Sequence, residues 1–231
     1  MSNHEDEALE RDRLRFDIDP DGTVEGADGE LATTLRYVCR MGGQMGALLG
    51  LGELERITTL STVAVMARVG GVSPHVSIRA EVERRDVRGR EPVARVDVTA
   101  RQAINQSLGR VIVDFGGDWA AIITDDKRLV GARNGMSTRR AVPAAVYEVG
   151  IRALAVLGAL DEALRETDVR LHFVRGSVLV AALGDHALFA QADKFDESAV
   201  VTTVSAIQSL FRHVDLTYAH MVKVAPMPER G

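Results

Sequence analysis

A hydrophobic pattern that occurs twice constrains the fold of this chain more than any other feature. Apolar or small residues recur at steps of four, three, four, three and four residues, and the same steps return 111 residues later. The first set runs from Leu31 to Leu49 and the second from Val142 to Leu160. This spacing places the side chains on one face of an amphipathic helix of about five turns. Two copies predict a duplicated unit.

Similar segments flank both helices. A short apolar run, an acidic turn, a second short strand and a glycine precede each one, over Phe16 to Gly29 and over Ile122 to Gly135. Another strand follows each helix, over Arg56 to Val69 and over Val169 to Leu183. The order strand, turn, strand, helix, strand predicts an α/β module that is present twice. Matched copies predict an internal or intermolecular pseudo-dimer.

Glycines at a spacing of four mark the first long helix, expected over 31–51. Each glycine costs about 1 kcal/mol of helix propensity relative to alanine, so a packing role is expected. The two long helices, 31–51 and 141–166, are therefore expected to pack against each other or against a second chain. The helix-packing residues predicted by this spacing are Gly42, Gly46 and Gly50.

The remaining segments give the expected organisation of the chain. Alternating residues on both sides of a charged tip predict a hairpin over 76–98, and a periodic segment over 104–115 predicts a helix that ends at Gly116. Residues 200–211 predict a last helix. The predicted divisions are an acidic N-terminal tail or short helix over 1–15, a first module over 16–99, a second module over 100–216 and a C-terminal tail over 217–231.

Composition limits the class of protein. The 231 residues are 46% hydrophobic and 26% charged, values typical of a globular protein. Cys39 is the one cysteine, so no intrachain disulfide can form and a reducing compartment is expected. The chain starts without an apolar signal segment, and no apolar run reaches the roughly 18 residues that span a bilayer. We expect a cytoplasmic protein with no membrane insertion.

Charge is distributed unevenly. Residues 1–30 contain eleven acidic side chains and three arginines, whereas the whole chain has a net charge of −5. This acidic balance, with 4% aromatic residues, argues against nucleic acid as a partner. Basic residues gather between 127 and 152, and arginine and tyrosine are enriched where protein interfaces bind most strongly. The predicted partner-binding residues are Arg139, Arg140, Tyr147 and Arg152.

Three segments together resemble the roadblock/dynein light chain family. They are Ala121 to Gly135, the long helix rich in small residues, and Val169 to Asp193 with its Gly184-Asp185-His186 turn. The resemblance covers residues 100–213. Residues 16–80 resemble a degenerate copy whose first helix is short or missing and whose last helix is replaced by the hairpin.

The resemblance implies a fold and a functional class. The fold is a tandem pair of roadblock-like α/β sandwiches with profilin-like topology, a mainly antiparallel sheet and helices on both faces. Members of the family dimerise, and similar bacterial proteins regulate Ras-like GTPases. The implied function is a non-enzymatic scaffold or interaction protein. Its implied partner is a small Ras-like GTPase or another roadblock protein, and it can form a homo-oligomer.

The search for catalytic motifs supports that class. The sequence has no G-x-x-x-x-G-K-[ST] phosphate loop, no G-x-S-x-G and no H-E-x-x-H. His172 and His186 are expected on neighbouring strands, without a carboxylate or cysteine beside them. We therefore expect no catalytic residues, no cofactor and no intrinsic turnover.

One motif points to a different chemistry. Asp17, Asp19, Asp21 and Gly22 match positions one, three, five and six of an EF-hand calcium loop, and Asp28 stands at position twelve. Alternating carboxylates around a glycine turn can point at one hard cation, but position twelve normally holds a longer glutamate. A hairpin with a polar tip and no metal is the main interpretation, and calcium binding is one alternative. A small-molecule sensor domain is the other, which a buried polar pocket would support.

Overall fold

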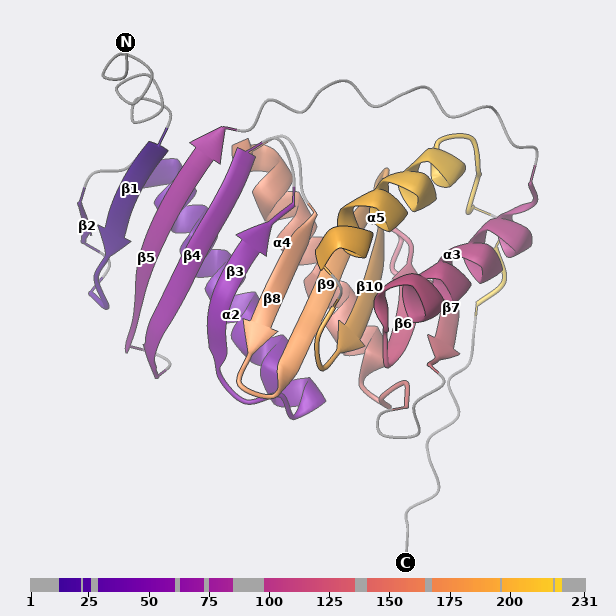
Figure 1. The fold of residues 1–231 in the computed structure, drawn as a ribbon, viewed down its shortest axis with the longest axis horizontal. Coiled ribbons are helices and arrows are strands. Elements are labelled where there is room, and N and C mark those ends of the chain that lie inside the picture. The colour runs from indigo at the N-terminus through magenta and orange to yellow at the C-terminus, as the bar shows by residue number, and fades with distance from the viewer. Residues whose placement is uncertain are drawn as a thin grey trace, which may run out of the picture.

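The structure, a computed structural model, consists of one large antiparallel sheet with helices on both faces (Figure 1). It describes residues 13–21, 23–25, 29–60, 63–72, 75–84, 98–135, 141–164, 168–195, 197–217 and 219–221. Within these residues there are ten strands and four helices. We call residues 13–84 the N-terminal half and residues 98–221 the C-terminal half.

Each half contributes five strands. The elements of the N-terminal half are β1 (Arg13–Ile18), β2 (Val24–Glu25), α2 (Gly29–Leu49), β3 (Leu54–Thr59), β4 (Val63–Val72) and β5 (His75–Arg84). Those of the C-terminal half are α3 (Ala100–Phe115), β6 (Trp119–Ile123), β7 (Leu129–Asn134), α4 (Val146–Leu164), β8 (Val169–Phe173), β9 (Gly176–Leu183), β10 (His186–Ala192) and α5 (Glu197–Phe211).

The strands of the two halves are arranged in the same order on either side of a central pair. The sheet runs β2-β1-β5-β4-β3-β8-β9-β10-β6-β7, so each half proceeds from its short outer hairpin to its own innermost strand. At the centre β3 pairs with β8 in antiparallel register, with Ile57 opposite Leu171 and Thr58 opposite Arg170. The β3–β8 pair joins the two halves into a single sheet.

The helices form two layers. Helices α2 and α4 cover one face of the sheet and contact each other. Helices α3 and α5 cover the other face over the C-terminal half, with α3 on β6 and β7 and α5 on β9 (Figure 1). The expected α/β fold, with an antiparallel sheet and helices on both faces, is confirmed.

Local chemistry explains the boundaries of the helices. Thr99 begins α3 with a capping box, in which its hydroxyl accepts from the Gln102 amide and the Gln102 side chain accepts from the Thr99 amide. Gly116 ends it with a φ of 73°, a conformation that glycine adopts without strain. Gly50 ends α2 in the same region, with a φ of 63°. Helix α4 starts at Val146 rather than near residue 141. The chain forms a turn before the helix, in which the Pro143 carbonyl accepts a hydrogen bond from the Val146 amide.

Two sequence predictions in the N-terminal half were wrong. The segment 56–69 forms two antiparallel strands, β3 and β4, rather than one. Both edges of β5, which was expected to start a hairpin over 76–98, are occupied by other strands. Strand β5 pairs with β4, from Val63 opposite Arg84 to Val72 opposite His75, and on its other side with β1. Residues 85–97 lie outside the described residues, and so do residues 1–12 of the predicted tail.

In the part of the chain that the structure describes, no helix has both the length and the apolar character needed to cross a membrane.

Candidate functional site

The layer formed by α2 and α4 contains two of the predicted partner-binding residues. Arg152 of α4 donates from Nε to the Gln44 Oε1 of α2 at 2.8 Å, and from Nη1 to the Glu148 carbonyl at 2.8 Å. Its guanidinium thus links the two halves of the molecule. Tyr147 is 43% exposed on the same helix. The other two predicted residues, at positions 139 and 140, lie outside the described residues.

The glycines of α2 lie against the sheet. A Cβ on Gly42 would lie 3.0 Å from Leu54 Cδ2, and a Cβ on Gly46 would lie 2.7 Å from both the Gly52 carbonyl oxygen and a Phe173 ring carbon. Gly50 has open space around it and serves as the turn after the helix. The close approach that the spacing predicts is therefore between α2 and strands β3 and β8.

A groove of about 910 Å³ lies between α2 and the β4–β5 hairpin. Strands β4 and β5 each have ten residues, whereas β9 and β10 have eight and seven, so this hairpin extends further beside its helix. Apolar side chains line the floor and α2 supplies the cationic rim. The residues that line the groove include Arg36, Tyr37, Cys39, Arg40, Gln44 and Ile78.

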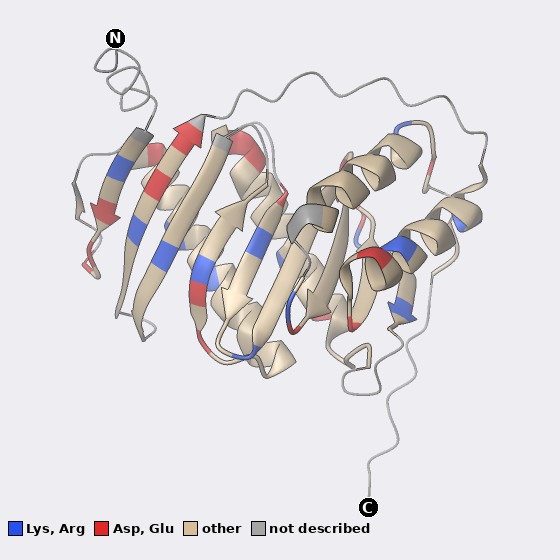
Figure 2. Cartoon of the chain, viewed as in Figure 1, with Lys and Arg blue, Asp and Glu red and all other residues tan. Residues whose placement is uncertain are grey.

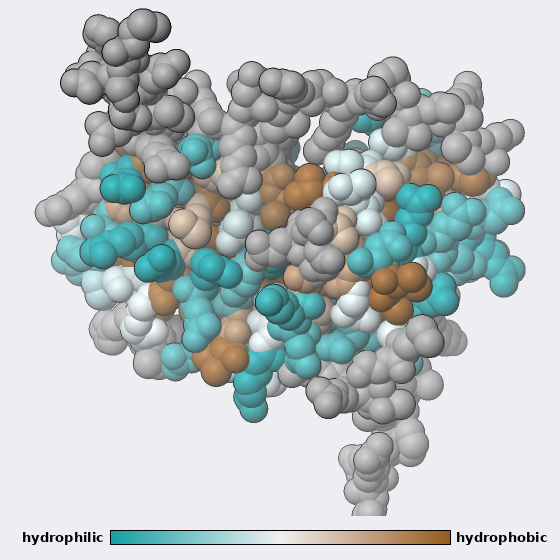
Figure 3. All heavy atoms as spheres, in the orientation of Figure 1, coloured by the Kyte–Doolittle hydropathy of each residue, from teal (hydrophilic) through white to brown (hydrophobic). Residues whose placement is uncertain are grey.

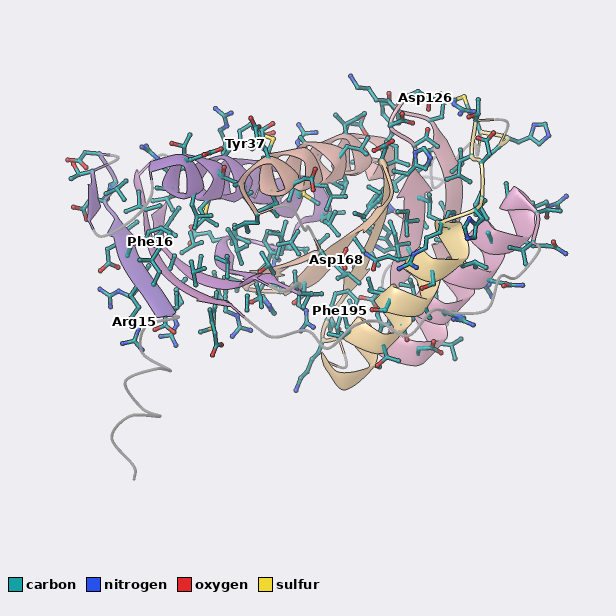
Figure 4. All side chains as sticks on the ribbon, turned by 90° about the horizontal axis from the view of Figure 1, so that it is seen from above. Arg15, Phe16, Tyr37, Asp126, Asp168 and Phe195 are labelled. Atoms are coloured by element: carbon teal, nitrogen blue, oxygen red, sulfur yellow. The ribbon has the colours of Figure 1, made fainter. Side chains whose placement is uncertain are left out.

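Arg36, Tyr37 and Arg40 are the residues of this groove that sequence reasoning missed. The Arg40 guanidinium lies 5.2 Å from the centroid of the Tyr37 ring, a cation–π contact that holds both side chains. Tyr37 lies on the side of the sheet covered by helices α2 and α4, opposite to Arg15 (Figure 4). A signal was present, since Arg36 and Arg40 are four residues apart on the helix. Gln44 lines the groove and binds Arg152, so the groove adjoins α4.

Cys39 lies at the back of the groove. Burial raises the pKa of its thiol to about 12, because the thiolate would lose its hydration. It is a core residue without a nucleophilic role at neutral pH.

The predicted calcium loop is only partly described. The Asp17 carboxylate accepts from Arg79 Nε at 2.8 Å. Asp21 accepts from the Thr23 amide at 2.9 Å, which lowers the pKa of its carboxyl. Asp28 is outside the described residues. Within the ranges the structure describes, no three His, Cys, Asp or Glu side chains are placed to hold a metal ion.

The two histidines expected on neighbouring strands are separated by β9. His172 lies on β8 and His186 at the start of β10, where its Nδ1 accepts from the Asp125 amide at 3.2 Å. The prediction was wrong because β8 to β10 form a simple meander, in which only consecutive strands are neighbours.

Arg128 of the basic segment has a structural role. Its Nη1 and Nη2 donate to the carbonyls of Ala219 and Leu216 at 3.1 and 3.2 Å, and its Nε forms an ion pair with Asp126 at 2.6 Å. This side chain holds the residues after α5 against the β6–β7 turn.

The comparisons with known proteins concern fold. No family model and no curated protein matches the chain. MglB of Myxococcus xanthus is 13% identical with a TM-score of 0.41, over 51% of this chain and 92% of that chain. The gliding protein MglB of Thermus thermophilus is 18% identical with a TM-score of 0.38, over 53% and 96%. An MglB with a tetrameric arrangement is 21% identical with a TM-score of 0.37, over 53% and 96%.

The chain resembles the roadblock family. Each match covers about half of this chain and nearly all of the other.

Proposed function

We propose that this chain is a non-enzymatic interaction protein that binds and regulates a small Ras-like GTPase through the layer formed by α2 and α4. The observation that carries the proposal is the continuity of this layer. The groove beside α2 is joined to α4 through Gln44 and Arg152, so cationic and aromatic side chains from both halves adjoin one another. Regulation of small GTPases is the activity at the level of the family that the chain resembles.

The chemistry of the layer fits a protein partner. Arg36 and Arg40 are exposed cations, and Tyr37 and Tyr147 provide aromatic contact area. Arginine and tyrosine contribute strongly to protein interfaces because they combine area with directed hydrogen bonds. Charge complementary to acidic or mixed surfaces of a partner raises the association rate and selects the partner.

The test uses the full chain with Ras-like GTPases of its source organism, each loaded with GDP or with a non-hydrolysable GTP analogue. We expect one GTPase to form a complex that depends on its nucleotide and to change its rate of GTP hydrolysis or exchange. The chain alone should neither bind nor hydrolyse GTP. Saturable GTP binding by the chain itself, or no complex with any GTPase, contradicts the proposal.

A pair of double variants locates the interface. Arg36→Glu with Arg40→Glu reverses two exposed charges at the groove and should weaken the complex by at least about tenfold. Arg101→Glu with Arg110→Glu makes the same charge change on exposed positions of α3, across the sheet, and should leave binding unchanged. Equal binding by both variants places the interface elsewhere.

The basic residues before α4 give an independent test. Arg139→Glu with Arg140→Glu should weaken association with the GTPase and reduce its dependence on salt, and the melting temperature is measured as a control for folding. If this variant binds as well as the parent at low ionic strength, the start of α4 is not part of the interface.

A small-molecule sensor is a second candidate, favoured by the volume of the groove beside α2. Pockets that hold small ligands have volumes of about 300–1,000 Å³, and the groove has about 910 Å³. A thermal-shift screen with anionic amphipathic compounds tests it. A compound that raises the melting temperature of the parent but not of the Arg36→Glu, Arg40→Glu variant supports this role, and the absence of any such compound argues against it.

A further inference from the structure

The N-terminal half leaves one face of its sheet without a helix among the described residues. Helices α3 and α5 cover β6, β7 and β9 on this side, whereas β1, β5, β4 and β3 have no helix over them (Figure 1). Most apolar side chains of these four strands point to α2, whereas Met66 and most of the polar side chains point to the uncovered side. Figure 3 views the molecule from this side and shows hydrophilic residues gathered over these strands.

Two rows of directly opposed residues cross this open face from β1 to β3 and continue through β8 to β9, where α5 covers the sheet. The first row is Asp17, Arg79, Arg68, Arg56, His172 and Ser177. The second row is Arg15, Glu81, Met66, Thr58, Arg170 and Leu179. Basic bands lie across β5, β4, β3 and β8 in Figure 2. Alternation along a strand puts each row on the same side of the sheet.

At the outer edge the charges cancel. Arg79 Nε lies 2.8 Å from Asp17 Oδ1, and Arg15 Nε lies 3.3 Å from Glu81 Oε1. Each pair joins β1 to β5, and the four side chains are between 45% and 75% exposed.

In the middle of the face the charge is positive. Arg68 is exposed and makes no ion pair or hydrogen bond with any residue that the structure describes. Arg56 Nη2 donates to His172 Nδ1 at 3.3 Å. A guanidinium can only donate, so this imidazole nitrogen is unprotonated and leaves the charge of Arg56 uncompensated. Burial, and then Arg56 and Arg170, lower the pKa of His172 to about 4, so it is neutral at physiological pH.

We propose that this face binds an acidic helix of a partner protein, with two of its carboxylates on Arg56 and Arg68. The spacing fits: residues opposite each other on adjacent antiparallel strands are about 4.5–5.5 Å apart, and glutamates four residues apart on a helix have Cβ atoms about 5–6 Å apart. Guanidinium groups also bind carboxylates through paired hydrogen bonds. The helix crosses the strands over Met66, which offers an apolar contact.

The same rows disfavour a nucleic acid. Asp17 and Glu81 stand within the rows and would repel a regular chain of phosphates. A protein helix can place neutral or basic residues over them. In the C-terminal half the corresponding side of the sheet is already covered by α3 and α5, so a helix of a partner would complete the equivalent layer over the N-terminal half.

The experiment measures binding of a labelled helical peptide with glutamates four residues apart by fluorescence anisotropy. Its control has glutamine at the same positions. The glutamate peptide should bind the full chain at low salt at least about tenfold more tightly than the glutamine peptide, and Arg68→Glu should remove this preference. Arg68 has no described partner, so this substitution should leave the fold intact. Arg101→Glu with Arg110→Glu on α3 is the matched control and should bind like the parent.

Proton NMR of the His172 ring supplies a second readout. A carboxylate on Arg56 would lie beside this ring, so the peptide should shift the His172 ring signals in the parent and not in the Arg68→Glu variant. Equal affinity for both peptides, or unchanged binding after Arg68→Glu, overturns the proposal. The proposal is also overturned if the peptide binds only after residues 1–12 are removed, because the acidic N-terminal segment of the chain would then be the occupant of this face. Tighter binding of duplex DNA that is lost in Arg68→Glu overturns it in favour of nucleic acid. The inference does not depend on the proposed GTPase, since its probe is the peptide alone.

Discussion

The N-terminal and C-terminal halves have the same strand order and the same covering helix on one face, yet they differ on the other. In the C-terminal half, β9, β10 and β6 present Leu179, Leu188 and Ile122 to α3 and α5, and all three are fully buried. In the N-terminal half, β1, β4 and β5 present Arg15, Arg68 and Arg79 to the uncovered side.

The difference shows that the two faces of a sheet are specified separately. Alternate residues of a strand point to opposite faces of the sheet. In both halves the residues that point to one face are apolar and pack on α2 or α4. The residues that point to the other face decide whether helices cover it, because a charged side chain loses hydration when it is buried. Two halves with the same strand order can therefore have similar cores and different surfaces.

The largest expected effect is on the unfolding free energy, which should depend strongly on whether a substitution lies on the covered face or on the open face. Leu188→Ala removes a fully buried side chain between the sheet and the helices, and it should cost about 2–5 kcal/mol of unfolding free energy. Met66→Ala, on the open face, should cost less than about 1 kcal/mol. Urea denaturation measures both, and similar losses would mean that the open face is covered in solution.

The join between the halves should be nearly as sensitive. Gly46→Ala places a Cβ 2.7 Å from the Gly52 carbonyl and the Phe173 ring on β8, and overpacking of this kind costs about 1–3 kcal/mol. Gly46→Leu should disrupt the join further. Gly43→Ala on the same helix meets nothing within 4 Å and should stabilise the protein by about 0.5–1 kcal/mol. Equal melting temperatures for the two alanine variants would show that α2 does not approach β8 closely.

The pH dependence of stability reports on His172, which lies on β8 opposite Arg56 of β3. The folded state holds the pKa of His172 at about 4, against an unfolded value of about 6.5, so between these values the unfolded state binds more protons. Stability should therefore fall as the pH is lowered through this window. His172→Gln should reduce that fall. Parallel curves of unfolding free energy against pH for the parent and the variant would show that His172 is not held neutral.

The smallest effects are expected for the charged rows themselves. Arg68→Ala should change the unfolding free energy by less than about 0.5 kcal/mol, and Arg79→Ala by less than about 1 kcal/mol, because exposed ion pairs contribute little. Larger losses of unfolding free energy, measured by calorimetry, would mean that the charged rows stabilise the fold rather than bind a partner.

The sequence predicted most of the elements and few of the surface features. The repeated helical spacing located α2 and α4, and the Gly116-Gly117 signal located the end of α3. The β4–β5 pairing was missed because a period of two reveals strands but not their partners. The groove beside α2 depends on the extra length of that hairpin.

The charged rows were missed for a related reason. Arg56, Arg68 and Arg79 are 12 and 11 residues apart in the chain and adjoin only through strand register. The sequence instead predicted a binding role for arginines that are close together in the chain, near residue 140. Cross-strand neighbours become visible once the register is known.

Two similar halves form one sheet through β3 and β8, and amide hydrogen exchange tests this join most directly. The amides of residues 56–58 and 170–172 that point across the join should exchange as slowly as the amides of the interior strand β9. Exchange of these amides as quick as that of the outermost strands β2 and β7 would contradict the join, because β3 and β8 would then be free edges of two separate sheets.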